Sequence, residues 1–267
     1  MIIDSHTHLL LSSQKNDIEI AIKEAKENRV TKIFEIAVNL DYIKQARKLS
    51  KKYDEIYYSA GIHPCDAVEY GLDKLDEVMN NLENLIENSD KLIGIGECGL
   101  DFYWLSKDAK KAPQEVETQK AYFIAQIRLA KKLNIPLIIH DREAGFSVFE
   151  ILKQEEYGNF VFHCYNENLG YAKNILSDFP KAMFSFAGNL TYKSAKNIQE
   201  TAKNLPINKI MVETDAPYLT PQKFRGQENF PKNTLYTLEF LAELRGEDLD
   251  TLESQIYKNT TNFFNIK

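Results

Sequence analysis

The sequence lacks any apolar run long enough to span a bilayer, and it lacks the basic segment and apolar core of a signal peptide. Cysteine is scarce: three residues, an odd number in a chain of 267, do not make a disulfide framework and fit a reducing compartment. Linkers, low-complexity tracts and internal repeats are missing as well. These absences predict a cytoplasmic protein, without a membrane partner, in which residues 1–267 form a single domain.

An excess of positive charge is also missing. The formal net charge is −6, from 33 Lys and Arg against 39 Asp and Glu. This balance argues against a protein that holds nucleic acid on one large basic surface. It leaves nucleic-acid enzymes open, because bound divalent cations supply positive potential where a phosphate must sit. With 43% hydrophobic and 27% charged residues, the chain has enough apolar material for one sizeable core.

Apolar runs rich in β-branched residues alternate with amphipathic segments from end to end. The amphipathic segments have apolar residues at helical spacing, as at Ile18, Ala21, Ile22 and Ala25. The strand-like runs are almost continuously apolar, which is typical of parallel strands covered on both faces. The pattern predicts one (β/α)8 TIM barrel, with Asn233–Leu244 as its eighth helix and an extra C-terminal helix at Asp248–Phe264. The predicted strands are Met1–His6, Lys32–Val38, Ile56–Ile62, Leu92–Glu97, Pro136–His140, Phe160–His163, Ala182–Ala187 and Lys209–Glu213.

The chain begins with Ile2-Ile3-Asp4-Ser5-His6-Thr7-His8, an apolar strand that ends in two histidines. The i, i+2 spacing puts both imidazoles on one face of the strand. Such a pair alone is weak evidence, because it also occurs at ordinary polar strand ends. However, every histidine of the chain falls at the carboxyl end of a predicted strand, where barrel enzymes build their active sites. These histidines are His6, His8, His63, His140 and His163.

Glu97 and Asp215 follow the predicted fourth and eighth strands, so two carboxylates join the histidines. Even without His63, four histidines and two carboxylates are more ligands than one tetrahedral catalytic ion needs. They suit two divalent cations, which can activate a water and polarise a P–O bond. Glu97 is the predicted bridge between them, since its two oxygens can contact both. Asp215 is the predicted general base. The alternative interpretation is a set of hydrogen-bonded polar strand ends that bind no metal.

The sequence evidence for a role in the predicted site is weaker for His63 and Glu213. His63, in Gly61-Ile62-His63-Pro64, is interpreted as a phosphate or leaving-group contact or as a neighbour that orients a ligand. Ligation by His63 is not expected, because the two-metal set is complete without it. Glu213 shares a face with Asp215 and is expected to orient a histidine.

The loops after the strands carry cations, aromatic rings and cysteines. We expect the cations to hold phosphates of a polyanionic substrate, and the rings either to stack on bases or to pack at the rim. The cysteines Cys65, Cys98 and Cys164 are expected to be buried, inert thiols. The cations are Lys107, Lys110, Lys111, Arg142, Lys193, Lys196, Lys223 and Arg225, and the rings are Phe102, Tyr103, Trp104, Tyr165 and Tyr218.

Six motifs together make the chain resemble the TatD family of metal-dependent hydrolases over residues 4 to about 226. They are Asp-Ser-His-Thr-His (4–8), Gly-Ile-His-Pro (61–64), Gly-Glu-Cys-Gly-Leu-Asp (96–101), Pro-Leu-Ile-Ile-His-Asp-Arg (136–142), His-Cys-Tyr (163–165) and Glu-Thr-Asp-Ala-Pro-Tyr-Leu (213–219). The resemblance implies a TIM barrel of the amidohydrolase type and a metal-requiring deoxyribonuclease or phosphodiesterase activity. It implies a ligand set in which Glu97 bridges one ion held by His6, His8 and Asp215 and another held by His140 and His163.

One departure from the family concerns Glu228, which stands where an arginine is usual. It bears on substrate affinity or preference, whereas the metal site is expected to be untouched. The metals are Zn²⁺, Mn²⁺, Co²⁺ or Ni²⁺ by ligand softness, while the resemblance implies that Mg²⁺ also supports activity.

The leading functional hypothesis is a two-metal deoxyribonuclease that digests DNA from a 3′ end and prefers single strands. Metal-dependent ester or amide cleavage, or deacylation of a D-aminoacyl-tRNA, is the alternative within hydrolases. A non-catalytic binding barrel is the alternative outside them. A monomer is the expected state.

Overall fold

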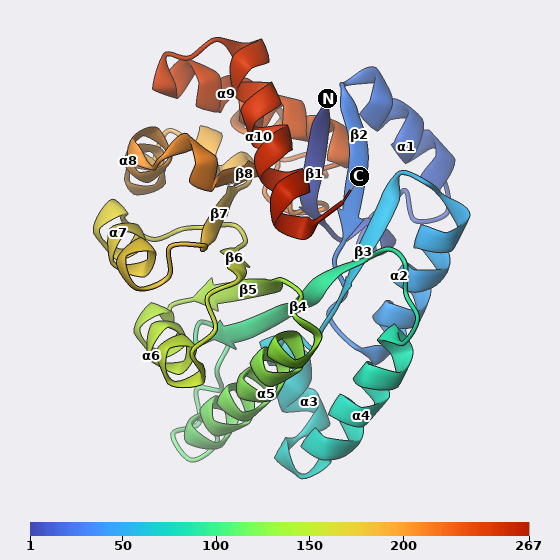
Figure 1. The fold of residues 1–267 in the computed structure, drawn as a ribbon, viewed down its shortest axis with the longest axis vertical. Helices are drawn as coiled ribbons and strands as arrows, with labels where there is room; N and C mark the ends of the chain where they lie inside the picture. The colour runs from blue at the N-terminus through green and yellow to red at the C-terminus, as the bar shows by residue number, and fades with distance from the viewer. Residues whose placement is uncertain (267) are drawn as a thin grey trace. The chain divides into compact units, whose positions relative to one another are not determined.

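The computed structural model describes residues 1–266, and each of the eight predicted strand segments contains a strand (Figure 1). Every strand differs from its predicted segment at one end or both, and the differences are largest for the second and fourth strands. The second strand begins earlier and ends at Glu35, and the fourth continues beyond Glu97 to Asp101. The strands are β1 (Ile2–Thr7), β2 (Val30–Glu35), β3 (Ile56–Ala60), β4 (Leu92–Asp101), β5 (Leu137–Arg142), β6 (Phe160–Phe162), β7 (Met183–Phe186) and β8 (Ile210–Val212).

Helices separate successive strands, and two of them, α3 and α4, follow β3. The α-helices are α1 (Ile18–Glu27), α2 (Leu40–Lys52), α3 (Pro64–Tyr70), α4 (Leu75–Ile86), α5 (Ala112–Leu133), α6 (Gly145–Glu155), α7 (Leu169–Asp178), α8 (Lys196–Asn204), α9 (Thr234–Arg245) and α10 (Leu249–Phe264). Short 3₁₀ helices are η1 (Leu9–Leu11), η2 (Leu72–Lys74), η3 (Gly188–Thr191), η4 (Ile207–Lys209), η5 (Gln222–Phe224) and η6 (Pro231–Asn233). Within residues 1–266, none of these helices has the length and apolar character needed to cross a membrane.

The strands form one sheet in the order β1-β2-β3-β4-β5-β6-β7-β8. The resolved registers of β1 with β2, β4 with β5 and β7 with β8 are parallel. A parallel bridge from Thr7 to Ala216 joins β1 to the segment after β8. The alternation of strand and helix with this strand order confirms the predicted (β/α)8 barrel.

Contacts group the chain into two compact units. Unit 1 comprises Met1–Glu35, Tyr53–Tyr57 and His163–Lys267, and unit 2 comprises Ile36–Lys52 and Tyr58–Phe162. The single domain spanning residues 1–267 stays a prediction.

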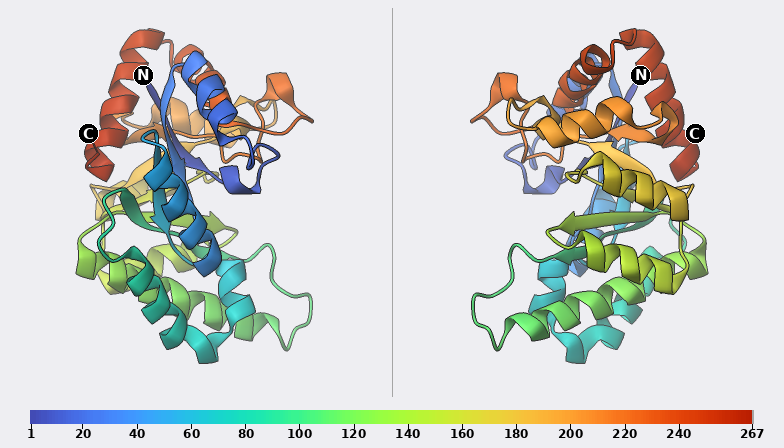
Figure 2. Two further views of the ribbon diagram at one scale, coloured as in Figure 1. Left: turned by 90° about the vertical axis from the view of Figure 1, so that its right-hand side faces the viewer. Right: turned by 90° about the vertical axis from the view of Figure 1, so that its left-hand side faces the viewer.

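In unit 1, helix α10 packs against β1 and β8. The ring of Phe264 meets Phe34 of β2 edge-on, with centroids 5.1 Å apart. The Met1 amine pairs with Glu253 of α10, so the N-terminus lies beside this helix (Figure 2). Asn259 donates to the carbonyls of Ile207 and Ile210 at the start of β8. The predicted C-terminal helix therefore covers the amino-terminal strand of the chain and stabilises the entry into its last strand.

In unit 2, the glycines of β4 allow it to approach β5 closely. A Cβ atom on Gly96 would lie 2.5 Å from the carbonyl oxygen of Ile138, and one on Gly99 would lie 2.0 Å from that of His140. Both glycines also have positive φ angles, 145° and 141°, which side chains disfavour. The strands that carry Glu97 and His140 can therefore lie this close together only with glycine at positions 96 and 99.

Candidate metal centre

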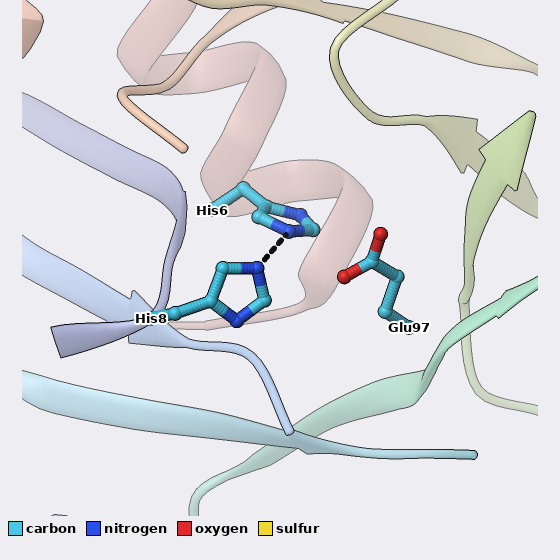
Figure 3. A group of neighbouring side chains, drawn as sticks. All are labelled: His6, His8 and Glu97. Carbon is cyan, nitrogen blue, oxygen red and sulfur yellow. Dashed lines mark hydrogen bonds between the residues drawn. The ribbon is translucent and has the colours of Figure 1, made fainter. Parts of the chain in front are cut away.

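The first group of site residues lies in unit 1, at the carboxyl end of β1. The Nε2 atoms of His6 and His8 are 3.3 Å apart, and Figure 3 shows these ring nitrogens directed toward each other, with the ring planes at 80°. Asp215 Oδ1 lies 3.8 Å from His6 Nε2 and 3.5 Å from His8 Nε2. The structure therefore brings together the three residues expected to share one ion, although Asp215 lies at the opposite end of the sequence.

These separations fit a bound cation. Ligand atoms of a tetrahedral ion with bonds of about 2.0–2.1 Å lie about 3.3 Å from one another. The three donor atoms are separated by 3.3 to 3.8 Å, so they reach this arrangement with small adjustments. Two imidazoles and one carboxylate are also the donors that Zn²⁺ and related transition-metal ions prefer.

His163 extends this group. Its ring stacks on that of His6, with centroids 3.9 Å apart and an interplanar angle of 13°. His163, His6 and Asp215 each place a ligand atom within 4.8 Å of the others. Glu213 Oε1 lies 3.4 Å from His163 Nδ1 and accepts a hydrogen bond of 2.7 Å from the Cys164 amide. Glu213 thus lies beside a histidine, and its role in orienting His163 stays a prediction.

Backbone contacts place Asp215 against β1. The Asp215 amide donates to the carbonyl of His6 at 2.8 Å, and the His8 amide donates to that of Ala216 at 2.7 Å. Asp215 has a φ angle of 57°, a left-handed conformation that Asp tolerates better than most residues. Pairing of the first strand with the segment after the last strand therefore assembles this ligand group.

Two buried carboxylates fix the backbone around the histidines. Asp4 accepts from the amide and hydroxyl of Thr214, at 2.9 and 2.6 Å. Glu35 accepts from the amides of Leu9 and Leu10, at 2.9 and 3.0 Å, which fixes the turn directly after His8. Sequence reasoning missed Glu35; its signal is a lone acid in the middle of the apolar run Ile33-Phe34-Glu35-Ile36-Ala37.

For both Asp4 and Asp215, burial raises the pKa of the carboxyl group whereas its hydrogen bonds lower it. Burial raises the pKa of Asp4 well above its usual value, against the hydrogen bonds from Thr214. Burial also favours a higher pKa for Asp215, but the hydrogen bond with His8 and the nearby histidines outweigh it and lower that pKa. Asp215 is therefore ionised at neutral pH, as a metal ligand or proton acceptor must be.

The second group lies in unit 2, on β4, β5 and the segment after β3. His140 Nδ1 is 2.7 Å from Glu97 Oε1, and His140 Nε2 is 3.0 Å from Asp101 Oδ2. A neutral imidazole has one N–H for these two acceptors. With that proton on Nε2 and shared with Asp101, the Nδ1 lone pair and the Glu97 carboxylate face each other, and this arrangement favours a cation between them.

His63 lies closer to this group than the sequence suggests. His63, Glu97 and His140 each offer a ligand atom within 4.8 Å of the others. His63 Nε2 is 3.9 Å from Glu97 Oε1, while its Nδ1 accepts a hydrogen bond from the Cys65 amide at 3.2 Å. Because Nδ1 accepts this hydrogen bond, the proton of the neutral ring is on Nε2. Nε2 can therefore donate a hydrogen bond to a phosphate oxygen, and it can coordinate an ion only after it has lost this proton.

Asp101 is a site residue to which sequence reasoning assigned no role. Burial alone raises its pKa, but the hydrogen bond with His140 and the charges of His140 and His63 lower it overall. The residue was detectable, because β4 is extended and alternate residues of a strand share a face, so Glu97 and Asp101 project to the same side. The predicted end of the strand at Glu97 hid this relation.

Two buried glutamines of α5 hold the backbone of this second group. Gln119 accepts from the Asp101 amide and donates to its carbonyl, both at 3.0 Å. Gln126 does the same for Ile62, next to His63, at 2.7 and 3.0 Å. The two glutamines are seven residues apart and so lie on one helix face. Helix α5 thereby fixes two strand ends of the site through matched amide hydrogen bonds.

Replacement of Gln126 by leucine is expected to lower the free energy of unfolding by about 2–4 kcal/mol, because it leaves the buried N–H and C=O of Ile62 without these partners. Urea denaturation of the variant and the wild type measures the difference. Gln45→Leu on α2 is the control: Gln45 is exposed, and its replacement is expected to change the free energy by about 0.5 kcal/mol or less. Equal losses in the two variants would contradict this role of Gln126.

Two of the predicted phosphate-binding cations lie over aromatic rings, and Glu228 joins two loops. The guanidinium of Arg142 lies over the ring of Tyr103 and that of Arg225 over Tyr192, at 3.9 and 4.7 Å from the centroids. Glu228, the residue that departs from the family, accepts a 2.7 Å hydrogen bond from the Ser13 amide and so joins the loop after β1 to the loop after β8.

The cysteines only partly follow the prediction. Cys98 is fully buried. Cys65 and Cys164 are half-buried, so the prediction of three buried thiols is wrong for these two. Burial, with nearby acidic groups, raises the pKa of Cys65 to about 12, which keeps its thiol protonated and unreactive.

Comparisons with known proteins show the family to which the chain belongs. The family model described as TatD related DNase matches residues 3–265. The uncharacterized metal-dependent hydrolase YabD of Bacillus subtilis is 34% identical over 268 residues, covering 100% of each chain. YjjV, a TatD homolog from Escherichia coli, has a crystal structure with a TM-score of 0.91 and 26% identity, over 100% of this chain and 98% of that one. A TatD-family hydrolase from Entamoeba histolytica, with a TM-score of 0.86 over 98% and 97% of the two chains, is 22% identical and supports the fold alone.

Proposed function

Because this chain belongs to the TatD related DNase family and is a metal-dependent hydrolase, we propose that it hydrolyses the phosphodiester bonds of DNA with two divalent cations. We propose further that it removes nucleotides from 3′ ends of single strands, as a monomer in the cytoplasm. The observation that carries the proposal is the grouping of imidazoles and carboxylates at strand ends, with His6, His163 and Asp215 in one group and His63, Glu97 and His140 in the other.

The proposed ligand assignment is the one expected from the sequence; it differs from these groups at His163, which lies with His6 and Asp215, and at His63, which lies with Glu97 and His140. In this proposal His6, His8 and Asp215 would hold one cation, His140 and His163 would hold the second, and Glu97 would supply a carboxylate oxygen to each. Bound there, the cations supply Lewis acidity toward a phosphate oxygen and lower the pKa of a coordinated water. Zn²⁺, Mn²⁺ and Mg²⁺ are the candidates.

The protein side chains supply the remaining steps. Asp215, ionised and close to both imidazoles of β1, accepts the proton of the attacking water. His63 donates from Nε2 to a phosphate or leaving-group oxygen. Arg142 and Arg225 hold flanking phosphates of the strand, where a guanidinium makes bidentate contacts. Glu213 and Asp101 orient His163 and His140.

A nuclease assay tests the proposal. Protein purified without chelator is incubated with single-stranded and duplex DNA, each labelled at its 5′ end, with Mg²⁺, Mn²⁺ or Zn²⁺ added in turn. We expect a ladder shortened from the 3′ end, faster on the single strand, and abolished by EDTA. Simple esters and a D-aminoacyl-tRNA are assayed in parallel. Metal-dependent turnover of either, with no release of nucleotides, would replace the proposal by esterase or deacylase activity.

A further inference from the structure

The segment between β4 and α5 carries an exposed aromatic pair that the proposed chemistry does not use. Tyr103 is 50% and Trp104 is 65% exposed. Their rings meet edge to face, with centroids 4.9 Å apart. Figure 2 shows this segment extending from the rest of unit 2. Large apolar rings on a surface loop have no packing role that explains such exposure, and they indicate a binding surface.

A cation supports the pair from β5. The guanidinium carbon of Arg142 lies 3.9 Å from the centroid of Tyr103 and 5.7 Å from that of Trp104. Arg142 pairs with Asp101 in the ladder of β4 and β5, and its carbonyl accepts from the Phe102 amide at 2.9 Å. The cation–π contacts and the ladder therefore place the rings at a fixed position relative to the two strands.

The pair is joined to the metal-binding group through one side chain. Asp101 Oδ1 accepts a 3.0 Å hydrogen bond from the Trp104 amide, and Asp101 Oδ2 lies 3.0 Å from His140 Nε2. The same carboxylate thus orients a histidine of the site and fixes the backbone of the exposed tryptophan. The backbone amide of Trp104 is therefore separated from His140 by a single side chain, that of Asp101.

The charges beside the rings suit a polyanion. Three exposed lysines and one aspartate follow Trp104 before α5, in a chain whose overall charge is −6. With Arg142, four cations lie in or beside this segment, together with Asp108 and two acids that hold its backbone: Asp101 accepts from the Trp104 amide and Glu115 from the Ser106 amide. Aromatic rings beside cations are the usual surface for single-stranded nucleic acids, in which unpaired bases stack on the rings and phosphates contact the cations. The lysines are Lys107, Lys110 and Lys111.

We propose that Trp104, supported by Tyr103 and Arg142, is a stacking subsite for a nucleobase next to the phosphate that is cleaved. The inference rests on the proposed function and adds to it the group that selects an unpaired base. Every base has a π face, so this subsite holds bases of any sequence. It also favours single strands, since the bases of a duplex are already stacked on one another.

Trp104 is the only tryptophan of the chain, so fluorescence excited at a wavelength that tyrosine does not absorb reports on this residue alone. The chelator-treated protein is titrated with a single-stranded oligothymidylate and with a strand of equal length whose terminal three residues at the 3′ end are abasic. We expect the intact strand to quench the fluorescence and the abasic strand to quench it much less. Equal quenching by both, or none by either, would overturn the subsite.

Kinetics supply an independent test. Trp104→Ala is expected to raise KM for the intact strand about tenfold, the loss of roughly one stacked base, with kcat nearly unchanged. Turnover of the abasic strand, which lacks the base, is expected to be the same in variant and wild type. Trp104→Phe retains a ring and is expected to recover most of the affinity. An equal loss on both strands would assign Trp104 a structural role instead.

Failure of the subsite and failure of the proposed function give different results. If the wild type cleaves the strand and Trp104→Ala cleaves it equally well, the subsite is wrong and the nuclease proposal stands. If the wild type cleaves neither strand, the nuclease proposal fails, and the fluorescence titration alone decides whether bases bind. A change in oligomeric state in Trp104→Ala, with unchanged quenching and kinetics in Tyr103→Ala, would assign the rings to a protein contact.

Discussion

Asp215→Asn is expected to reduce hydrolysis about 10²–10⁴-fold while the fold is retained. Loss of a general base alone has this magnitude. The amide keeps the size of the carboxylate and one oxygen, but it neither carries the negative charge nor accepts the proton. Asp215 Oδ1 lies within 3.8 Å of both His6 Nε2 and His8 Nε2, so the change also removes a charge that helps hold a cation beside these rings.

Three measurements distinguish the possible causes of the loss of activity in Asp215→Asn. Initial rates on a single-stranded oligonucleotide give the loss of activity, metal content per protein separates loss of the ion from loss of the base, and thermal melting checks the fold. Asp41→Asn, at an exposed position of α2, is the control and is expected to be as active as the wild type. Full activity in Asp215→Asn would eliminate the proposed mechanism. A normal metal content with a large loss of rate would assign Asp215 chiefly to proton transfer.

Local patterns were sufficient to predict the strands and their order. Runs such as Phe160–His163 and Ala182–Ala187 are continuously apolar because parallel strands are covered on both faces. The extension of β4 to Asp101 could not be predicted in the same way. Gly96 and Gly99 weaken a strand signal, and only the close approach of β5 explains why they are there.

The ligands were easier to predict than the residues that support them. Histidines and acids at strand ends are visible in sequence because barrel topology puts those ends on one face. In contrast, Glu35, Gln119 and Gln126 act through hydrogen bonds to backbone far away in the sequence. No periodic pattern in the sequence identifies such residues, because a buried glutamine on a helix cannot be distinguished by sequence pattern from an exposed one. Glu228 is similar: its bond to the Ser13 amide depends on two loops that only the fold brings together.

Single replacements of His8 and His140 are expected to remove different cations. His8 lies with His6 and Asp215 at the end of β1, whereas His140 lies between Glu97 and Asp101 on the fourth and fifth strands. We therefore expect two equivalents of Mn²⁺ in the wild type and about one in His8→Ala or His140→Ala. Hydrolysis is expected to fall by more than roughly 100-fold in each, beyond the usual effect of residues that only orient a ligand.

Equilibrium dialysis against limiting Mn²⁺ counts the ions, and paramagnetic resonance distinguishes a coupled pair from a single ion. His63→Ala sharpens the experiment, because His63 lies with Glu97 and His140 but has no place in the proposed ligand set. It is expected to keep both ions and to lose activity through weaker contact with phosphate. Loss of an ion in His63→Ala, or two ions retained in His8→Ala, would contradict the assignment. Loss of both ions from either ligand variant would contradict the expected single remaining ion and would show that the two positions fill together through the carboxylate of Glu97.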